Sequence, residues 1–159
     1  MLLDSKRPFY LVSGVLILGL LGIVVYFEYQ KIADKNSITI FTAAKPVKIQ
    51  VEFARTPQEL ENGLMNRDSL DKNSGMFFIF PNEKTRNFWM KDTLIPLDVI
   101  FISSKGRVNE ITTQEPCPET GTCDSYDSKN PAQYVLEINA GSADQWGMSV
   151  GDIIELPEL

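Results

Sequence analysis

The sequence predicts a mainly β domain, a compact β-sandwich or partly open barrel with two short helices, preceded by one transmembrane helix. Three observations lead to this class: an uncharged run near the N-terminus, about seven short apolar or alternating segments between turn residues, and only two helix-start signals. The 159 residues are 43% apolar and 23% charged, the proportions of a folded domain. Many short strands with few helices favour this class over a parallel α/β sheet.

The segment 9–27 holds 19 consecutive residues without a charge. As a helix it would extend about 28 Å, close to the roughly 30 Å hydrocarbon core of a bilayer. Lys6 and Arg7 precede the run, so the positive-inside bias places residues 1–8 in the cytoplasm and the rest of the chain outside it. The alternative is a cleavable signal peptide, but residues 26–29 offer no small-residue cleavage site. We therefore expect a single-pass anchor in the cell membrane.

Residues 28–37 carry charges without a clear periodicity and predict a linker, so that the extracytoplasmic domain spans 38–159. Apolar and polar residues alternate over 47–53, as in a half-buried strand. The sequence Thr-Pro-Gln-Glu at 56–59 then has the form of a capping box with proline at the first helical position. A short helix to about Met65 is the expected result.

The remainder of the domain is predicted to consist of short strands and one further helix. Apolar runs that are bounded by turn residues and are too short for a helix favour strands. The predicted extended segments are 75–80, 88–90, 97–102, 107–111, 134–138 and 151–156, with a turn at 104–106 that makes a hairpin. Ser142 is the expected cap of a helix of one or two turns through Trp146.

The charge distribution excludes several functions. The formal net charge is −6, and residues 115–159 hold nine acidic groups against Lys129 alone, so nucleic acid is not an expected partner. The chain has no histidine, which removes mechanisms that need an imidazole base. We expect no cofactor and no metal site. Two metal hypotheses are weaker than their alternatives. Packing in the core is favoured over Cu(I) binding by Met65, Met76 and Met90 with cysteine. A solvated loop is favoured over Ca²⁺ binding by the acidic cluster Glu115, Glu119, Asp124 and Asp127.

Cys117 and Cys123 are the two cysteines of the chain. They enclose five residues, including Pro118 and Gly121, which allow a short loop to bend back. An oxidising compartment outside the cytoplasm predicts a disulfide between them. A zinc site would need two further ligands, and redox pairs usually have only two residues between the cysteines.

Charged residues inside apolar strands are the candidate functional site. Asp98 and Glu137 each stand between apolar neighbours, and a buried carboxylate needs a cationic or hydrogen-bonding partner. One hypothesis is that both converge with nearby polar and aromatic residues in one cleft that binds a ligand. The alternative is that strand alternation places both carboxylates on outer faces in water. The candidate ligand-binding residues are Arg67, Trp89, Lys91, Thr93, Asp98 and Glu137.

Several motifs resemble one protein family. They are Gly-Leu-Met-Asn-Arg at 63–67, Gly-Met-Phe-Phe-Ile-Phe at 75–80, Trp-Met-Lys-Asp-Thr-Leu-Ile-Pro-Leu-Asp at 89–98 and Tyr-Val-Leu-Glu-Ile-Asn-Ala-Gly at 134–141, with Gly-Met-Ser-Val-Gly-Asp at 147–152. In this order they resemble the DUF192 family of uncharacterised bacterial and archaeal proteins, over about 46–156. The resemblance implies a compact, mostly β domain, often exported or membrane-anchored, and it implies no activity.

The function that the sequence favours is an extracytoplasmic module that binds a small polar ligand, with a carbohydrate as one candidate, or that has a structural role. The alternative is a hydrolase that uses Asp98 and Glu137 as its carboxylates. Such a mechanism requires the two groups to stand about 5–9.5 Å apart in one cleft. The sequence leaves open whether the domain is an enzyme.

Overall fold

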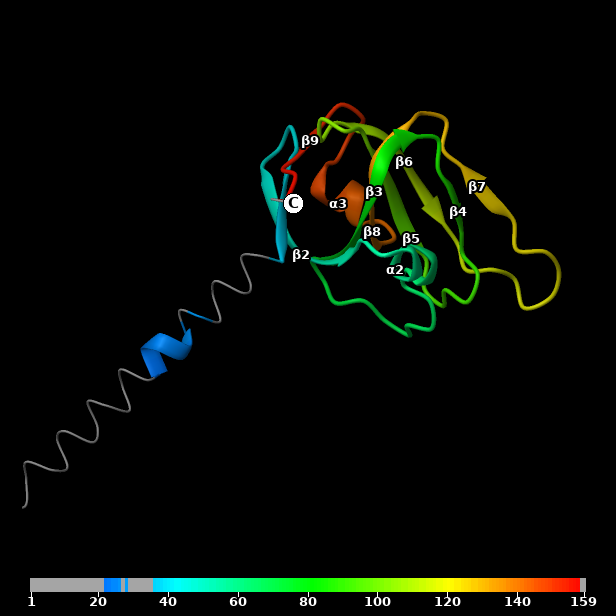
Figure 1. Ribbon diagram of the computed structural model, residues 1–159, viewed down its shortest axis with the longest axis horizontal. Helices are drawn as coiled ribbons and strands as arrows, with labels where there is room; N and C mark the ends of the chain where they lie inside the picture. The colour runs from blue at the N-terminus through cyan, green and yellow to red at the C-terminus, as the bar shows by residue number, and fades with distance from the viewer. Residues whose placement is uncertain (1–21, 27, 29–35, 158–159) are drawn as a thin grey trace, which may run out of the picture. The chain divides into compact units, whose positions relative to one another are not determined.

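The computed structural model describes residues 22–26, 28 and 36–157 (Figure 1). The chain divides into two units, Met1–Lys35 and Asn36–Leu159. The described residues of the first unit are helical and exposed. All of the strands that the structure describes belong to the second unit, which contains the predicted β domain.

The predicted membrane anchor at 9–27 lies largely outside the described residues. Within the part of the chain that is described, no helix combines the length and the apolar character needed to cross a bilayer. The anchor therefore stays a prediction from the sequence.

A seven-stranded sheet forms the second unit, with the strand order β6-β5-β8-β3-β2-β1-β9. Neighbouring strands are antiparallel except for β2 and β3, which are parallel and are connected through a helix. The seven strands are β1 (Ser37–Phe41), β2 (Pro46–Ala54), β3 (Ser74–Lys84), β5 (Leu97–Ile102), β6 (Val108–Gln114), β8 (Ala132–Asn139) and β9 (Ile153–Ile154). A separate two-stranded ribbon consists of β4 (Asn87–Trp89) and β7 (Ser125–Asp127).

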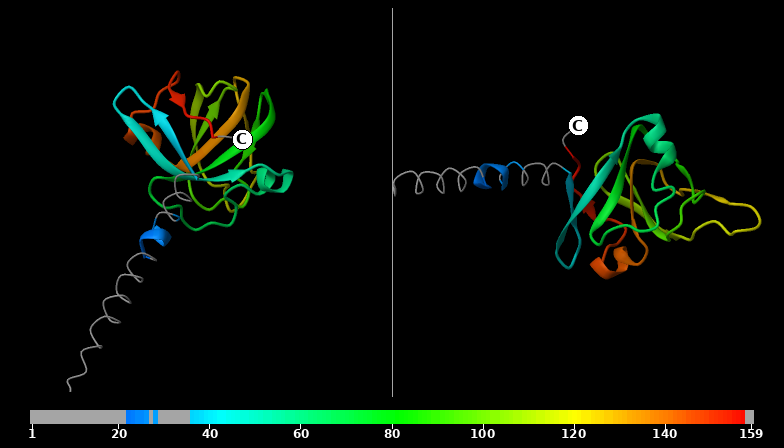
Figure 2. Two further views of the ribbon diagram at one scale, coloured as in Figure 1. Left: turned by 60° about the vertical axis from the view of Figure 1, so that its left-hand side comes forward. Right: turned by 90° about the horizontal axis from the view of Figure 1, so that it is seen from below.

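The sheet curls, and a short segment before β6 at one edge contacts β9 at the other (Figure 2). The Ile154 amide in β9 donates to the Gly106 carbonyl at 2.8 Å, just before β6, and the Val108 amide donates to the Asp152 carbonyl at 2.9 Å. Gly106 has φ +76°, and a Cβ atom there would lie 2.5 Å from the Ile154 carbonyl oxygen, so this approach requires glycine. The mainly β class is confirmed, and the sheet has the form of a curled half-barrel.

Two short helices in the second unit confirm that part of the prediction. Helix α2 (Pro57–Asn62) begins with the predicted capping box, in which the Thr56 side chain accepts from the Glu59 amide and the Glu59 carboxylate accepts from the Thr56 amide at 2.9 Å. It ends three residues before Met65, because Gly63 adopts a positive φ of 47°.

Helix α3 (Ser142–Trp146) occupies the predicted position, but its N-cap differs from the prediction. Gly141 is the N-cap residue and makes no side-chain bond, whereas Ser142 is already inside the helix. The Ala143 amide of the first turn instead donates to the Asp98 carboxylate of β5 at 3.0 Å. A side chain from the sheet thus takes the position expected of a local cap.

Apolar side chains cover both faces of the sheet. One cluster draws residues from all seven strands and fills the curl, for example Ile38, Phe77 and Ile154. The second cluster lies on the other face, where Leu60 of α2, Phe88 of β4 and Tyr126 of β7 pack against it. Every residue of β5 is buried, since both of its faces are covered.

The two cysteines lie in the loop between β6 and β7. Their sulfur atoms are within bonding distance, and the Cα atoms of Cys117 and Cys123 are 5.1 Å apart, a separation that a disulfide spans. The placement agrees with the predicted pairing.

Candidate functional site

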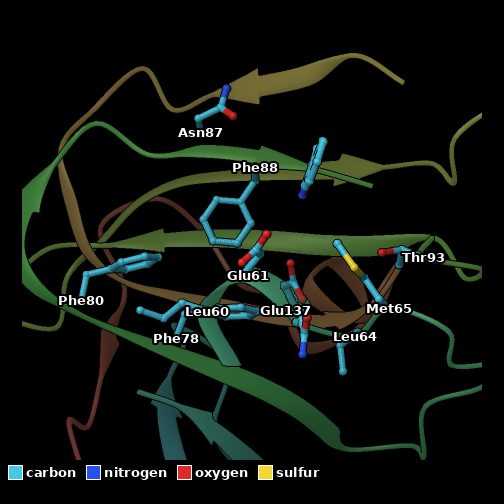
Figure 3. A pocket seen from close by; sticks show the side chains of 13 residues that line it. Leu60, Glu61, Leu64, Met65, Phe78, Phe80, Asn87, Phe88, Thr93 and Glu137 are labelled. Atoms are coloured by element: carbon cyan, nitrogen blue, oxygen red, sulfur yellow. The ribbon is translucent and has the colours of Figure 1, made fainter. Parts of the chain in front are cut away.

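A pocket of about 180 Å³ lies on the second face of the sheet (Figure 3). Its walls come from α2 and the turn after it, from β3, β4 and β8, and from the loop after β4. The lining residues are Leu60, Glu61, Asn62, Gly63, Leu64, Met65, Phe78, Phe80, Asn87, Phe88, Trp89, Thr93 and Glu137.

The two loops that border the pocket are joined through their backbones. The Asn66 amide donates to the Asp92 carbonyl at 2.6 Å, which links the turn after α2 to the loop after β4. Both residues have a positive φ, 59° and 53°, a conformation that asparagine and aspartate tolerate better than most side chains. This link brings Met65 and Thr93, 28 positions apart in the sequence, into one pocket wall.

Glu137 is the buried ionisable group of the pocket. Its Cα partners across β8 are Met76 of β3 and Val99 of β5, which belong to the second face. The residue is 6% exposed, and within the described part of the chain its carboxyl has neither a hydrogen bond nor an ion pair. Burial raises the pKa of this carboxyl from 4.5 to about 8.

Glycine at position 63 leaves space beside the Glu137 carboxyl that a side chain would partly fill. A Cβ atom on Gly63 would lie 3.7 Å from Glu137 Oε2 and 3.2 Å from the Phe78 ring. No fully enclosed polar side-chain atom in the described residues lacks a hydrogen bond, so the unbonded carboxyl oxygens are open to the pocket. The carboxyl is therefore available to a bound molecule.

Four aromatic residues form much of the pocket wall: Phe78, Phe80, Phe88 and Trp89. Phe88 packs edge to face on Phe78 and Phe80, with ring centroids 5.4 and 6.3 Å away. Trp89 is 45% exposed, which places it at an open side of the pocket.

Two cationic side chains contact this wall without lining the pocket. The Lys91 ammonium nitrogen lies 5.2 Å from the centre of the Trp89 ring. The buried Arg86 guanidinium lies 3.9 Å from the centre of the Phe80 ring, and its Nε donates to the Ala132 carbonyl at 2.9 Å. Desolvation lowers the pKa of Arg86 from its usual value.

Of the six sequence candidates, three line the pocket: Trp89, Thr93 and Glu137. Lys91 does not line the pocket, but its ammonium group lies over the Trp89 ring and its carbonyl accepts from the Thr93 hydroxyl at 3.3 Å. Arg67 lies outside the lining and forms a two-bond ion pair with Glu52, with Nη2 and Oε2 2.7 Å apart. This pairing holds the pKa of the Glu52 carboxyl below its usual range.

Asp98 lies on the opposite face of the sheet from Glu137. Its Cα partner on β8 is Ile138, the residue after Glu137, and successive residues of a strand point to opposite faces. Asp98 is 2% exposed and accepts hydrogen bonds from the Thr113 hydroxyl at 2.7 Å and from the Ala143 amide at 3.0 Å. The convergence of all candidates in one cleft is therefore not found. Asp98 joins α3 to the sheet and adds a side-chain bond between the paired strands β5 and β6.

Sequence reasoning did not single out several pocket residues. Glu61 and Asn62 lie in the last turn of α2, and Asn87 lies at the start of β4. The sequence offered one signal for them: the capping box and Gly63 mark the two ends of α2, and the last turn of this helix lines the pocket. Within the described residues there is no group of three or more His, Cys, Asp or Glu side chains that could hold a metal ion.

The fold and the pocket define a class: a small domain with a curled β-sheet and a lateral pocket that contains a buried carboxyl. Residues 38–156 match the DUF192 family, described as "Uncharacterized ACR", and the chain belongs to this family. No curated protein matches the chain.

Two solved structures resemble the chain closely. A candidate transcription regulator from Sinorhizobium meliloti 1021 shares 36% identity with a TM-score of 0.69, over 75% of this chain and 91% of that one. A protein of unknown function from Novosphingobium aromaticivorans DSM 12444 shares 34% identity with a TM-score of 0.68, over 76% of this chain and 84% of that one.

Proposed function

We propose that the chain is a membrane-anchored module outside the cytoplasm that binds a small polar ligand in the pocket at Glu137. The observation that carries the proposal is the Glu137 carboxyl, which is buried, unbonded and open to the pocket. A polar group in this position has lost its hydration on folding, and a ligand that hydrogen-bonds to it offsets that loss.

The size and lining of the pocket support a small ligand. At about 180 Å³ the pocket is smaller than the roughly 300–1,000 Å³ of sites for drug-sized ligands. Asn62 brings a polar side chain to the lining. Asn87 and Thr93 contribute their oxygen atoms as acceptors, because the Asn87 amide nitrogen and the Thr93 hydroxyl already donate to protein groups. The Trp89 ring offers a flat apolar surface at the open side. A carbohydrate ring, with one apolar face and several hydroxyl groups, is one ligand of this size and character.

The proposed location is supported by the uncharged run at 9–27 and by Lys6 and Arg7 before it. The placement of Cys117 and Cys123 within bonding distance agrees with an oxidising compartment.

Two other functions are not part of the proposal. The hydrolase that uses Asp98 with Glu137 lacks support because the two side chains lie on opposite faces of the sheet. The role as a regulator of transcription, which the Sinorhizobium protein suggests, lacks support because residues 115–159 carry nine acidic groups and a single lysine.

Thermal unfolding of the full-length protein in detergent, with a panel of sugars, polyols, amino acids and amines, tests the proposal. At a hundredfold excess over its dissociation constant, a ligand stabilises the fold by about 2.7 kcal/mol and raises Tm by several degrees. Trp89→Ala and Glu137→Gln should reduce the shift, whereas Glu119→Gln, in the exposed cysteine loop, should not. A panel in which no compound raises Tm would contradict the proposal.

A further inference from the structure

The charged groups of the pocket have one sign. Its lining contains two carboxyl side chains, Glu61 from α2 and Glu137 from β8, and no lysine or arginine. The cross-strand neighbours of Glu137, Met76 and Val99, are uncharged. Once Glu137 is ionised, the charges of the lining disfavour an anionic ligand and favour a cation.

Glu137 lacks the counter-ion that a buried carboxylate requires. The other buried carboxyls of the domain differ in this respect. Asp98 accepts two hydrogen bonds, and the Glu110 carboxylate accepts from the Tyr126 hydroxyl and, at 2.8 Å, from the Lys129 amide. Among these three, only the Glu137 carboxyl has no hydrogen-bonding partner, so it is the one that a ligand can satisfy.

The aromatic wall adds a second attraction for a cation. The faces of aromatic rings carry negative charge density and attract ammonium and guanidinium groups. Lys91 and Arg86 already lie over the Trp89 and Phe80 rings. Their charges oppose a further cation at those two rings, so the favourable position is beside Glu137, next to Phe78.

These observations point to a chemical class. We propose that the pocket binds a small organic cation, a compound with a protonated amine on an apolar body, and that the Glu137 carboxylate is its counter-ion. This inference rests on the proposed function and narrows its ligand class. The amine donates hydrogen bonds to the carboxylate, and the apolar body contacts the aromatic wall.

Binding of such a ligand is coupled to the ionisation of Glu137. Before the ligand binds, burial holds the pKa of the carboxyl at about 8, so the group is mostly protonated at neutral pH. An ammonium ligand requires the ionised form, and a proton leaves Glu137 for the buffer when the ligand binds. The observed affinity should rise roughly tenfold per pH unit up to about pH 8. Glu61 is the other titratable group of the lining, so proton release must also be measured in Glu61→Gln.

The test uses the full-length protein in detergent with two probes of matched size, cyclohexylammonium and cyclohexanol, and with a larger neutral sugar, methyl glucoside. The first is charged between pH 6 and 8, like a lysine amine, whereas the other two are neutral. Isothermal titration calorimetry gives each dissociation constant, and repetition in buffers of different ionisation enthalpy gives the number of protons released. We expect cyclohexylammonium to bind at least about tenfold more tightly than either neutral probe, with release of close to one proton at pH 7.

Variants assign the effect to one side chain. Glu137→Gln keeps the shape of the protonated carboxyl and should fold, and it should abolish both the preference for the amine and the proton release. Glu61→Gln should retain the proton release, and Glu119→Gln should behave as the natural chain.

The outcomes separate the inference from the proposed function. If the amine and a neutral probe bind equally and neither binds to Trp89→Ala, the inference that the ligand is a cation is wrong. The proposal that the pocket binds a small polar ligand would remain. An amine preference that survives in Glu137→Gln would overturn the role of this residue. If no probe binds and no compound of the wider panel raises Tm, both proposals fail.

Discussion

Buried carboxyl groups separate the structural from the candidate functional residues of this domain. Asp98, Glu110 and Glu137 are 2%, 7% and 6% exposed. The first two hold segments together through hydrogen bonds to α3, β6 and β7. The third has no such bond and opens into a pocket, which is the combination that marks a binding group.

The raised pKa of Glu137 predicts how stability depends on pH. The pKa of about 8 in the folded protein exceeds the value of 4.5 expected when the chain unfolds. This group therefore favours the folded state most below pH 4.5, and its contribution falls by about 1.4 kcal/mol per pH unit until about pH 8. Urea unfolding near pH 5 and near pH 8 should show Glu137→Gln gaining a few kcal/mol relative to the natural chain over this range. An equal pH dependence in both proteins would show that Glu137 is not desolvated.

Asp98→Asn should lower stability, in contrast to Glu137→Gln, because each oxygen of the Asp98 carboxylate accepts a hydrogen bond. The variant can still accept from the Ala143 amide, but its NH2 group must donate to the Thr113 hydroxyl, so two hydrogen bonds to a carboxylate become weaker bonds to a neutral amide. We expect a loss of about 1–3 kcal/mol in unfolding free energy and no loss of ligand affinity. Unchanged urea unfolding would show that these bonds contribute little.

For individual residues, the sequence identified which side chains are unusual but not which face of the sheet each one occupies. It marked Asp98 and Glu137 because each interrupts an apolar run. Which face each occupies depends on the register between β5 and β8, where Asp98 pairs with Ile138 rather than with Glu137. A shift of one residue would reverse that result, and nothing local in either strand fixes the register.

The helix α2 links local sequence signals to the pocket. Its capping box fixes the first turn, and its last turn and Gly63 line the pocket. Thr56→Ala removes the side chain that accepts from the Glu59 amide, so we expect a loss of about 1 kcal/mol in unfolding free energy, together with weaker ligand binding. Thr120→Ala, in the exposed cysteine loop, is the matched control. Equal stability of the two variants would contradict the capping role.

The strands show where periodicity is informative and where it is not. The apolar strands β3, β5 and β8 were predicted from their composition, and the alternation in β2 was visible. Strand β1 was missed although Ile38 and Ile40 alternate with polar residues, because the segment follows directly on the linker. Strand β7 has three residues and pairs only with β4, so its pattern is too short to recognise.

The cysteine loop predicts a local effect of reduction. Cys117 and Cys123 are six positions apart, and closing so short a loop stabilises the fold by about 2–3 kcal/mol at most in the chain-entropy model. Cys117→Ser with Cys123→Ser should therefore lower Tm moderately and leave the fold intact. Mass spectrometry of the protein isolated without reductant should show the bonded pair, and two free thiols would contradict it.

The molecule as a whole depends on contacts between distant segments. Strand β9, near the C-terminus, pairs with β1 at the start of the domain and bonds to the residues before and within β6. The strand order also places β8 between β5 and β3. A pattern of strands predicts the mainly β class, but this order follows from long-range pairing. The sequence therefore left sandwich and barrel as alternatives.

The unit at 1–35 gives a prediction about topology. Residues 9–27 are uncharged, and the positive flank of Lys6 and Arg7 precedes them, so the domain at 38–159 should face outward. Protease added to intact spheroplasts should then remove a C-terminal tag, whereas a cytoplasmic control protein stays protected. A tag that is cut only after the membrane is permeabilised would contradict this topology. N-terminal sequencing of the membrane-bound protein distinguishes the two export routes, because an anchor retains Lys6 and Arg7 whereas a cleaved signal peptide removes them.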